Sequence, residues 1–458
     1  MFKRTRTLIL GNKLVSFLFC FSLIFFLYQH TTGISWDFSS YVLNAKYIFS
    51  DGGYFEWYRP PLASVIIGLL SVFGWIIAEY LFIIFVLILH LFSSFKFSNK
   101  MGIDVRLYYA LSLSPFFFIY GMSVGTEILS LALIQLFLSY LDDKKGGIFF
   151  GLAFLTRYQN LIFLPLLFFK KNLNKIYLSF FISLVIIIPW LLFNLFHTGD
   201  AFTSLIESYA LNIKFRTYAL QDFNFLDLVK VGNILIPFFI GGIIISFRHL
   251  RDKIFRKNWT IMILFFVLSL YSYYNTPLKI DRYLFSLIIP LAYFSTLVIS
   301  KQKMWIYFFV AINLIVTLFL FNYASLESKE VYLFPLDNLD DSCALASNYW
   351  VPLNYLGYPS EPAPDERLVD RKIEQGYRVI LSKEIKEPAY TFDSDFLDNI
   401  PVIYEDSEYI ILGNESKCAW NDKLDNTYFD RVDLLYNEIY NKSFSITPFE
   451  ILFTDKQA

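Results

Sequence analysis

The stretch that decides the fold is residues 35–62, SWDFSSYVLNAKYIFSDGGYFEWYRPPL. It follows an apolar run at residues 8–28, which is too long for an ordinary helix of a soluble protein. We therefore expect that run to cross a membrane, and Asp37 and Arg59 to lie just beyond one face of the bilayer. A charged and aromatic-rich segment in that position indicates chemistry at the membrane surface.

The composition of the whole chain also indicates a membrane protein. Hydrophobic residues make up 56% of its 458 residues, with 52 Phe and 32 Tyr, and the mean hydropathy is +0.48. A chain of this kind is expected to be a polytopic α-helical membrane protein. We expect the lipid bilayer as its surroundings and no nucleic acid as a partner.

Basic residues between the apolar runs predict the topology. Lys3, Arg4 and Arg6 precede the first run, and residues 248–257 carry five Lys and Arg between two later runs. Cytoplasmic loops have an excess of Lys and Arg, so both groups are expected inside. The apolar runs then predict about eleven transmembrane helices. The N-terminus is expected in the cytoplasm and the C-terminal segment outside, in a multi-pass protein of the plasma membrane.

A change in composition marks a domain boundary near residue 325, because acidic residues become frequent beyond it. We expect a transmembrane domain at residues 1–325, with its first outer loop at 31–61, and a small soluble extracytoplasmic α/β domain at 326–458. Within the latter, residues 365–375 predict a helix, 377–381 a strand, and 401–412 a hairpin-like pair of strands. Nothing in this domain has a catalytic pattern.

The cysteines of the C-terminal domain are Cys343 and Cys418. Outside the cell they are expected to pair, since exposed free thiols are rare in oxidising compartments. Two free thiols are the alternative.

The predicted topology leaves a set of charged residues at the outer ends of spans unexplained: Asp37, Arg59, Glu127, Arg157, Lys279, Asp281 and Arg282. Ionisable groups near the membrane interior are costly, so they are functional candidates. Several cations and a carboxylate on one face are the composition of a site for a membrane-anchored phosphate and a base.

Structural interpretations of the same residues are open at this stage. Asp37 also fits the N-cap of a surface helix, and Glu127 fits a carboxylate that complements a helix N-terminus. Arg157 fits a side chain that snorkels to the surface. Asp281 and Arg282 fit a local ion pair at a span end.

The sequence predicts no metal site. No group of His, Cys and carboxylate residues has the spacing of metal ligands. A divalent metal is an open alternative that no motif indicates. His197 fits a loop residue better than a ligand, although it is kept as a substrate-binding candidate with Trp57, Tyr58 and Glu127.

Four short motifs occur in order along the transmembrane part. They are Tyr-Arg-Pro-Pro-Leu at 58–62, Thr-Glu at 126–127, Gly-Leu-Ala-Phe-Leu-Thr-Arg at 151–157 and Asp-Arg-Tyr-Leu-Phe-Ser-Leu-Ile-Ile-Pro at 281–290. With Asp37 beyond the first span, this order resembles the GT-C glycosyltransferases, in particular protein O-mannosyltransferases and lipid A aminoarabinose transferases. The resemblance covers residues 1 to about 325, and the C-terminal part resembles the extracytoplasmic domain of several prokaryotic members.

The resemblance implies a polyprenyl-phosphate sugar as donor and transfer at the outer membrane face with inversion at the anomeric carbon. Asp37 matches the family's first-loop acid and would take the proton from the acceptor hydroxyl. Arg59, Arg157, Lys279 and Arg282 are the candidates for the donor phosphate. Protein O-mannosyltransferases have an acidic pair in this loop, whereas Phe38 follows Asp37 here. The acceptor, whether protein, lipid or glycan, is therefore left open.

Two other classes of protein compete with this hypothesis. A polytopic transporter, flippase or polymerase for lipid-linked glycans would also have many spans and buried cations, although transporters often contain internal repeats and none is evident here. A non-enzymatic scaffold would leave the charges at the outer face unexplained. The sugar itself, a hexose such as mannose in the leading hypothesis, is not encoded in any motif.

Overall fold

The computed structural model describes residues 12–123, 125–169, 172–214, 221–300, 304–320, 326, 328–333, 336, 339, 343–364, 366–382, 394–397, 400–414 and 416–420. The basic residues Lys3, Arg4 and Arg6, expected in the cytoplasm, lie outside the described residues.

The chain divides into two units. The first comprises Met1–Gly52, Pro60–Phe193 and Gln221–Leu336, and the second comprises Gly53–Arg59, Asn194–Leu220 and Asp337–Ala458. This division differs from a single boundary near residue 325, because Gly53–Arg59 and Asn194–Leu220 belong with the C-terminal part.

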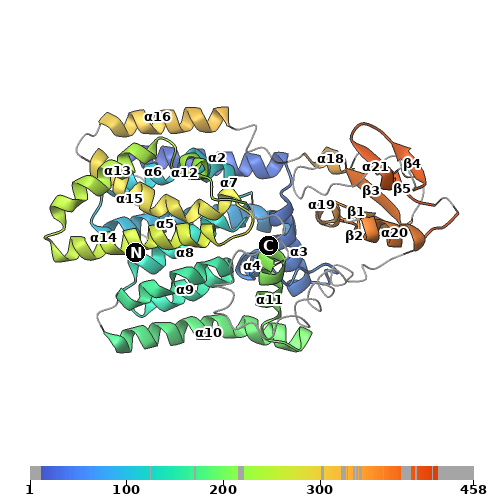
Figure 1. The fold of residues 1–458 in the computed structure, drawn as a ribbon, viewed down its shortest axis with the longest axis horizontal. Coiled ribbons are helices and arrows are strands. Elements are labelled where there is room, and N and C mark those ends of the chain that lie inside the picture. The colour runs from blue at the N-terminus through green and yellow to red at the C-terminus, as the bar shows by residue number, and fades with distance from the viewer. Residues whose placement is uncertain are drawn as a thin grey trace. The chain divides into compact units, whose positions relative to one another are not determined.

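The first unit is helical (Figure 1). Its elements are α2 (Lys13–Thr32), α3 (Trp36–Phe49), α4 (Leu62–Leu70), η1 (Ser71–Phe73), α5 (Trp75–Met101), α6 (Val105–Ser112), α7 (Pro115–Tyr120), α8 (Glu127–Ser139), α9 (Lys145–Thr156), η2 (Tyr158–Phe169), α10 (Leu173–Thr198, whose last turn belongs to the second unit), α12 (Phe225–Gly232), α13 (Leu235–Ser246), η5 (Phe247–His249), α14 (Lys253–Tyr274), η6 (Asp281–Leu287), α15 (Ile288–Ile299), α16 (Met304–Phe319) and α18 (Lys329–Leu333).

Five helices in the described part of the chain are long and apolar enough to cross a membrane: α2, α5, α10, α14 and η6 with α15. The pair α12 and α13, bent by 91°, makes a sixth candidate. Several other apolar helices have only 10–17 residues, among them α8, α9 and η2. The structure therefore does not establish the eleven crossings expected from the sequence.

Local sequence explains why some expected spans are broken. The apolar run at residues 105–121 forms two short helices, because Ser114 accepts a hydrogen bond from the Phe117 amide (3.3 Å) and Pro115 begins α7. The apolar run that ends near residue 247 is bent at Asn233, whose φ of 44° interrupts the helix between α12 and α13.

Buried polar side chains connect the helices of the first unit. Gln135 on α8 accepts hydrogen bonds from Ser93 (2.5 Å) and Ser94 (3.3 Å) of α5 and donates to the Tyr108 hydroxyl of α6 (3.0 Å). In an apolar environment an amide needs such partners, so this network also specifies how the three helices align.

Charged residues join three segments at the end of the helices that is expected to face the cytoplasm. Asp142, between α8 and α9, pairs with Lys100 of α5 (3.0 Å) and with Lys257 of α14 (2.5 Å). Burial raises the pKa of Asp142, but the hydrogen bonds and charges of Lys257 and Lys100 outweigh it and leave the pKa below its usual value.

The second unit contains a five-stranded mixed sheet in the order β2-β1-β3-β5-β4 (Figure 1). Its elements are α11 (Thr203–Tyr209), η3 (Ala210–Lys214), β1 (Leu345–Ser347), α19 (Trp350–Leu356), β2 (Ser360–Pro362), α20 (Glu366–Glu374), β3 (Arg378–Ser382), α21 (Ser394–Leu397), β4 (Val402–Glu405) and β5 (Tyr409–Leu412).

The sheet combines both strand directions. Strand β1 pairs in parallel with β2 and β3, whereas β5 is antiparallel to β3 and β4. The helix, strand and hairpin expected near 365–375, 377–381 and 401–412 correspond to α20, β3 and the β4–β5 pair. A disulfide joins Cys343 to Cys418, next to the backbone hydrogen bond from Ala344 to Ala419 (2.7 Å).

Candidate active site

Helix α3 begins at Trp36 and carries Asp37 in its first turn. Its N-cap is Ser35, whose hydroxyl accepts a hydrogen bond from the Phe38 amide (3.3 Å) and donates to the carbonyl of Ser123. The interpretation of Asp37 as the cap of this helix is therefore wrong. A carboxylate in the first turn is still favoured by the helix dipole.

Phe38 fixes the start of α3 against its neighbours. Its ring packs on His30 of α2 (4.9 Å between ring centroids) and on Phe82 of α5 (6.0 Å). Gly125 lies on another side with a φ of 83°, and a Cβ there would come within 2.6 Å of the Phe38 ring. These contacts hold the backbone that carries Asp37.

Asp37 forms an ion pair with Arg282, which lies 245 residues further along the chain. The Arg282 Nη1 atom donates to Asp37 Oδ2 at 2.8 Å, and the two side chains are only about one-fifth exposed. The local pair of Asp281 with Arg282 is thus not what the structure contains. Asp281 pairs instead with Lys230 of α12 (3.1 Å).

Glu127 and Arg157 form a second ion pair. Glu127 opens α8 and is buried, and Arg157 follows the last residue of α9. The Arg157 guanidinium also donates to Gln159 (3.3 Å). Glu127 is within electrostatic reach of Arg282 and Asp37, so the two pairs form one group in which two carboxylates balance two guanidiniums.

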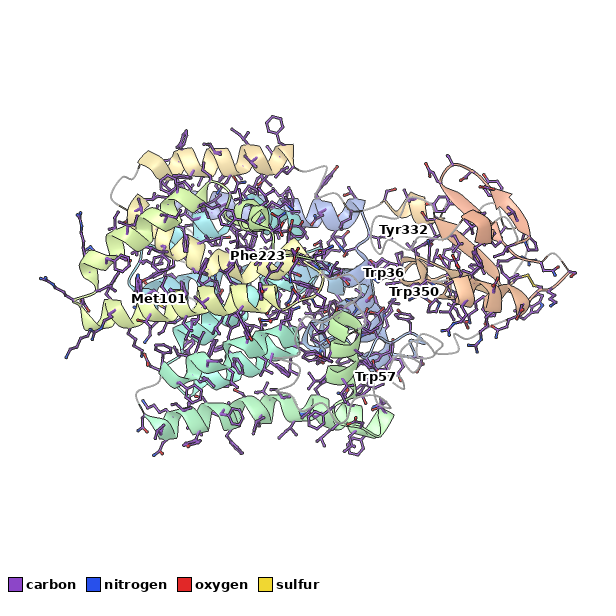
Figure 2. All side chains as sticks on the ribbon, viewed as in Figure 1. Trp36, Trp57, Met101, Phe223, Tyr332 and Trp350 are labelled. Atoms are coloured by element: carbon purple, nitrogen blue, oxygen red, sulfur yellow. A yellow bond between two sulfur atoms is a disulfide. The ribbon has the colours of Figure 1, made fainter. Side chains whose placement is uncertain are left out.

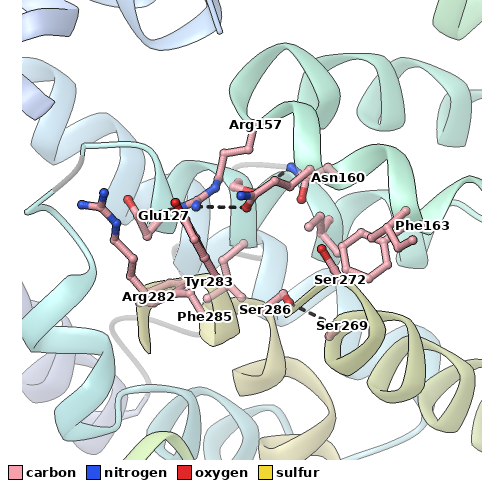
Figure 3. Close-up of a pocket in the computed structure, with 15 residues that line it drawn as sticks. Glu127, Arg157, Asn160, Phe163, Ser269, Ser272, Arg282, Tyr283, Phe285 and Ser286 are labelled. Carbon is pink, nitrogen blue, oxygen red and sulfur yellow. Dashed lines mark hydrogen bonds and ion pairs between the residues drawn. The ribbon is translucent and has the colours of Figure 1, made fainter. Parts of the chain in front are cut away.

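A pocket opens beside this group (Figure 3). It is partly open to solvent, and Glu127, Arg157 and Arg282 line one end. Ser269 and Ser272 lie toward the other end with Phe163. One end of the pocket is therefore charged and the other is lined by hydroxyls and aromatic rings.

Hydrogen bonds hold several of the polar lining residues in place. Asn160 donates to Ser130 (2.8 Å) and to the Ala153 carbonyl (2.7 Å), and Ser286 donates to Ser269 (3.0 Å; Figure 3). Sequence analysis missed these residues, because single Ser and Asn residues in apolar runs carry no motif.

Lys279 lies just before η6, the helix that carries Arg282, but its ammonium group donates to backbone carbonyls. It donates to the carbonyls of Tyr273 (3.3 Å), Tyr274 (2.7 Å) and Thr276, at the C-terminal end of α14. Burial lowers the pKa of Lys279. In this structure the lysine acts as a cap for α14, a favourable place for a cation.

Asp227 and Tyr273 belong to a further cluster of hydrogen-bonded side chains. Buried Asp227 accepts hydrogen bonds from Tyr273 (2.7 Å) and from Lys230 (3.2 Å), which also binds Asp281. The i,i+3 spacing of Asp227 and Lys230 was the only signal for this cluster in the sequence. The cluster holds α12 against the start of η6, which carries Arg282.

The remaining candidate residues belong to the second unit. Arg59 pairs with Glu56, and its guanidinium lies 5.1 Å from the Tyr58 ring centroid. The Trp57 ring lies 6.0 Å from the ring of His197. The structure thus brings Asp37, Glu127, Arg157 and Arg282 together in the first unit, whereas Arg59, Trp57, Tyr58 and His197 belong to the second unit.

The described residues contain no group of three or more His, Cys, Asp and Glu side chains that would hold a metal ion. What the site offers is two carboxylates beside two arginines. Planar guanidinium groups suit the bidentate recognition of phosphate, and a carboxylate suits proton transfer.

Comparison with known proteins finds a match in structure alone. No family model matches the chain, and no curated protein matches it in sequence. The crystal structure of ArnT from Cupriavidus metallidurans bound to undecaprenyl phosphate matches with a TM-score of 0.61 and 12% identity, over 89% of this chain and 99% of ArnT. This chain shares the fold of ArnT.

The apo structure of ArnT from the same organism agrees, with a TM-score of 0.54 and 11% identity over 85% of this chain and 95% of ArnT. Both structures therefore share their fold with this chain at very low sequence identity. The fold and the apolar helices are those of a multi-pass membrane protein.

Proposed function

We propose that the protein is a membrane glycosyltransferase that moves a sugar from a polyprenyl-phosphate donor to an acceptor hydroxyl. The observation that carries the proposal is the ion pair of Asp37 with Arg282 beside a second arginine and a pocket. The shared fold supports it, because ArnT has been crystallised with undecaprenyl phosphate.

The donor phosphate would bind at Arg282 and Arg157. Each guanidinium now pairs with a carboxylate. At Arg282 the phosphate can replace Asp37 as a bidentate partner, whereas Arg157 can keep Glu127 while it contacts the phosphate. When Arg282 turns to the phosphate, Asp37 gives up this ion pair and becomes more basic. Binding of the donor would thereby prepare Asp37 to act as the base.

Asp37 would then take the proton of the acceptor hydroxyl as its oxygen attacks the anomeric carbon. The new carbon–oxygen bond forms on the face opposite the phosphate, and the bond from the anomeric carbon to the phosphate oxygen breaks. The electron pair leaves with polyprenyl phosphate, whose charge the arginines stabilise, so no general acid is required. Attack on the opposite face inverts the anomeric configuration.

The proposal includes the finer features expected from the sequence. Transfer would take place at the outer face of the plasma membrane, with the N-terminus in the cytoplasm and the C-terminal domain outside. The sugar is proposed to be a neutral hexose such as mannose, and the acceptor a protein, lipid or glycan. Glu127 would hold Arg157 in the pocket.

The test is transfer of radiolabelled sugar from a panel of polyprenyl-phosphate donors to an extract of native membranes. The panel contains mannosyl, glucosyl and aminoarabinosyl polyprenyl phosphates. Label transferred from one donor supports the proposal, and the labelled product identifies the acceptor. No transfer from any donor, with lipid-linked glycan moved across proteoliposomes instead, would favour a transporter.

A further inference from the structure

Residues Gly53–Arg59, here called the anchor segment, belong to the second unit although they lie in the first outer loop. The middle of the segment is buried: Phe55 and Glu56 are at most 1% exposed, and Trp57 is 4% exposed. A carboxylate such as Glu56 is rarely buried to this degree without partners.

A chain of hydrogen bonds explains the burial of Glu56. The indole Nε1 of Trp350 donates to the Tyr54 hydroxyl at 2.9 Å, and this hydroxyl donates to Glu56 Oε1 at 2.5 Å. Arg59 Nε donates to Glu56 Oε2. Burial and the charge of Glu56 hold the pKa of Tyr54 well above its usual value, so its hydroxyl stays protonated and keeps donating.

Trp350 is itself part of the folded core of the C-terminal domain. It is 2% exposed and begins α19. Asn354, one turn later, donates to the carbonyls of Trp350 (2.8 Å) and Ser360 (2.7 Å), which ties α19 to β2. Trp57 and Trp350, both labelled in Figure 2, are therefore elements of one folded unit.

The anchor segment connects the helix that carries Asp37 to the next helix. Gly53 is reached from α3 through residues 50–52, and Arg59 leads to α4 through Pro60 and Pro61. Helices α3 and α4 pack together in the first unit, where Ser64 donates to the Tyr41 carbonyl at 2.9 Å. Fixing the segment restricts both helices, because only a few residues separate it from each.

We propose that the C-terminal domain anchors the first outer loop in its working conformation and that Trp350 is a positioning residue for the transfer reaction, acting through Tyr54 and Glu56. The role in transfer rests on the proposed function, whereas the anchoring does not. Arg59 has a structural role here, since it supplies the counter-ion that allows Glu56 to be buried.

The anchoring is tested by hydrogen exchange of the full-length protein in detergent. Trp350→Phe keeps a large ring but removes the donor to Tyr54, and Trp420→Phe is the matched control because Trp420 of the same unit is 76% exposed. Amides of residues 53–59 are expected to exchange about five- to tenfold faster in Trp350→Phe only. Unchanged exchange would overturn the proposal.

The positioning role is tested by kinetics. In Trp350→Phe we expect kcat to fall about tenfold with the donor KM unchanged. The number of undecaprenyl phosphate sites per protein should stay the same, whereas general unfolding would lower that number together with kcat. Unchanged kcat would overturn the positioning role.

Tyr54→Phe serves as a second variant in case Trp350→Phe does not fold. It removes one hydroxyl and should speed exchange of the same amides and lower kcat, because Glu56 loses a donor. If the wild-type protein transfers no sugar from any donor, the proposed function and the positioning role both fail. The exchange measurement still decides the anchoring in that case.

Discussion

At the scale of single residues, Arg282 joins two distant parts of the chain, because it forms an ion pair with Asp37, 245 residues earlier. Arg282→Lys keeps the positive charge but loses the planar fork that matches both a carboxylate and a phosphate. We expect kcat/KM to fall by about 10- to 100-fold, since a bidentate contact to the leaving phosphate is lost.

The control for this variant is Arg106→Lys, because Arg106 is exposed at the start of α6 and pairs only loosely with Asp104 (3.5 Å). Steady-state transfer rates of the two variants and the wild type test whether Arg282 binds the donor phosphate. Equal rates for Arg282→Lys and the wild type would remove Arg282 from the phosphate site.

The ion pair of Glu127 with Arg157 leads to a separate prediction about stability. Glu127→Gln removes the negative charge beside Arg157, whose side chain is 15% exposed. A buried cation that loses its counter-ion is costly, so the variant should be less stable by about 2 kcal/mol. A thermal unfolding curve equal to that of the wild type would show that the pair contributes nothing.

At the scale of elements, the ion pairs of Asp142 join α5 and α14 to the loop between α8 and α9. The pKa of Asp142 is lowered on folding, so its contribution is present above the pKa of the unfolded chain and is lost as the pH falls. We expect Asp142→Asn to be less stable than the wild type at pH 7, by less than about 1 kcal/mol because the group is partly exposed.

This difference in melting temperature should shrink as the pH falls from about 4 through the lowered pKa of folded Asp142, and it should vanish at lower pH, where Asp142 is protonated in both states. It should also shrink at high salt, because exposed charges are screened. A difference that is independent of pH would indicate that the ion pairs are not its cause.

Also at the scale of elements, the disulfide Cys343–Cys418 closes a loop of 75 residues that contains the strands of the sheet. Loop entropy predicts that replacing both cysteines by Ala destabilises the second unit by about 4 kcal/mol. Hydrogen exchange should therefore be faster in β1 and β3, with α5 and α8 of the first unit as internal controls. Unchanged protection of the strands would contradict this prediction.

At the scale of the whole molecule, the sequence indicated the class of fold better than the number of membrane crossings or the contacts between side chains. Apolar runs and motif order indicated a GT-C membrane protein, and ArnT shares the fold. Helix breaks at Ser114 and Asn233 depend on local backbone geometry, which hydropathy does not report. The number of crossings was therefore harder to predict than the fold.

The sequence did not predict which side chains pair with each other. Asp37 and Arg282 were both candidates, but 245 residues separate them and no pattern specifies their contact. Adjacent Asp281 and Arg282 suggested a local pair, whereas η6 directs one to Lys230 and the other to Asp37. The buried chain from Trp350 to Glu56 likewise depends on tertiary folding.

The most direct test of Asp37 as the general base is a single-turnover measurement of sugar transfer. It starts from a preformed complex with the preferred polyprenyl-phosphate sugar and compares the wild type with Asp37→Asn. The control is Asp51→Asn, since Asp51 is an exposed aspartate just beyond the end of the helix that carries Asp37. Loss of a general base predicts a rate at least about 100-fold lower for Asp37→Asn and a normal rate for Asp51→Asn. Transfer by Asp37→Asn at the wild-type rate would contradict the proposal that Asp37 is the base.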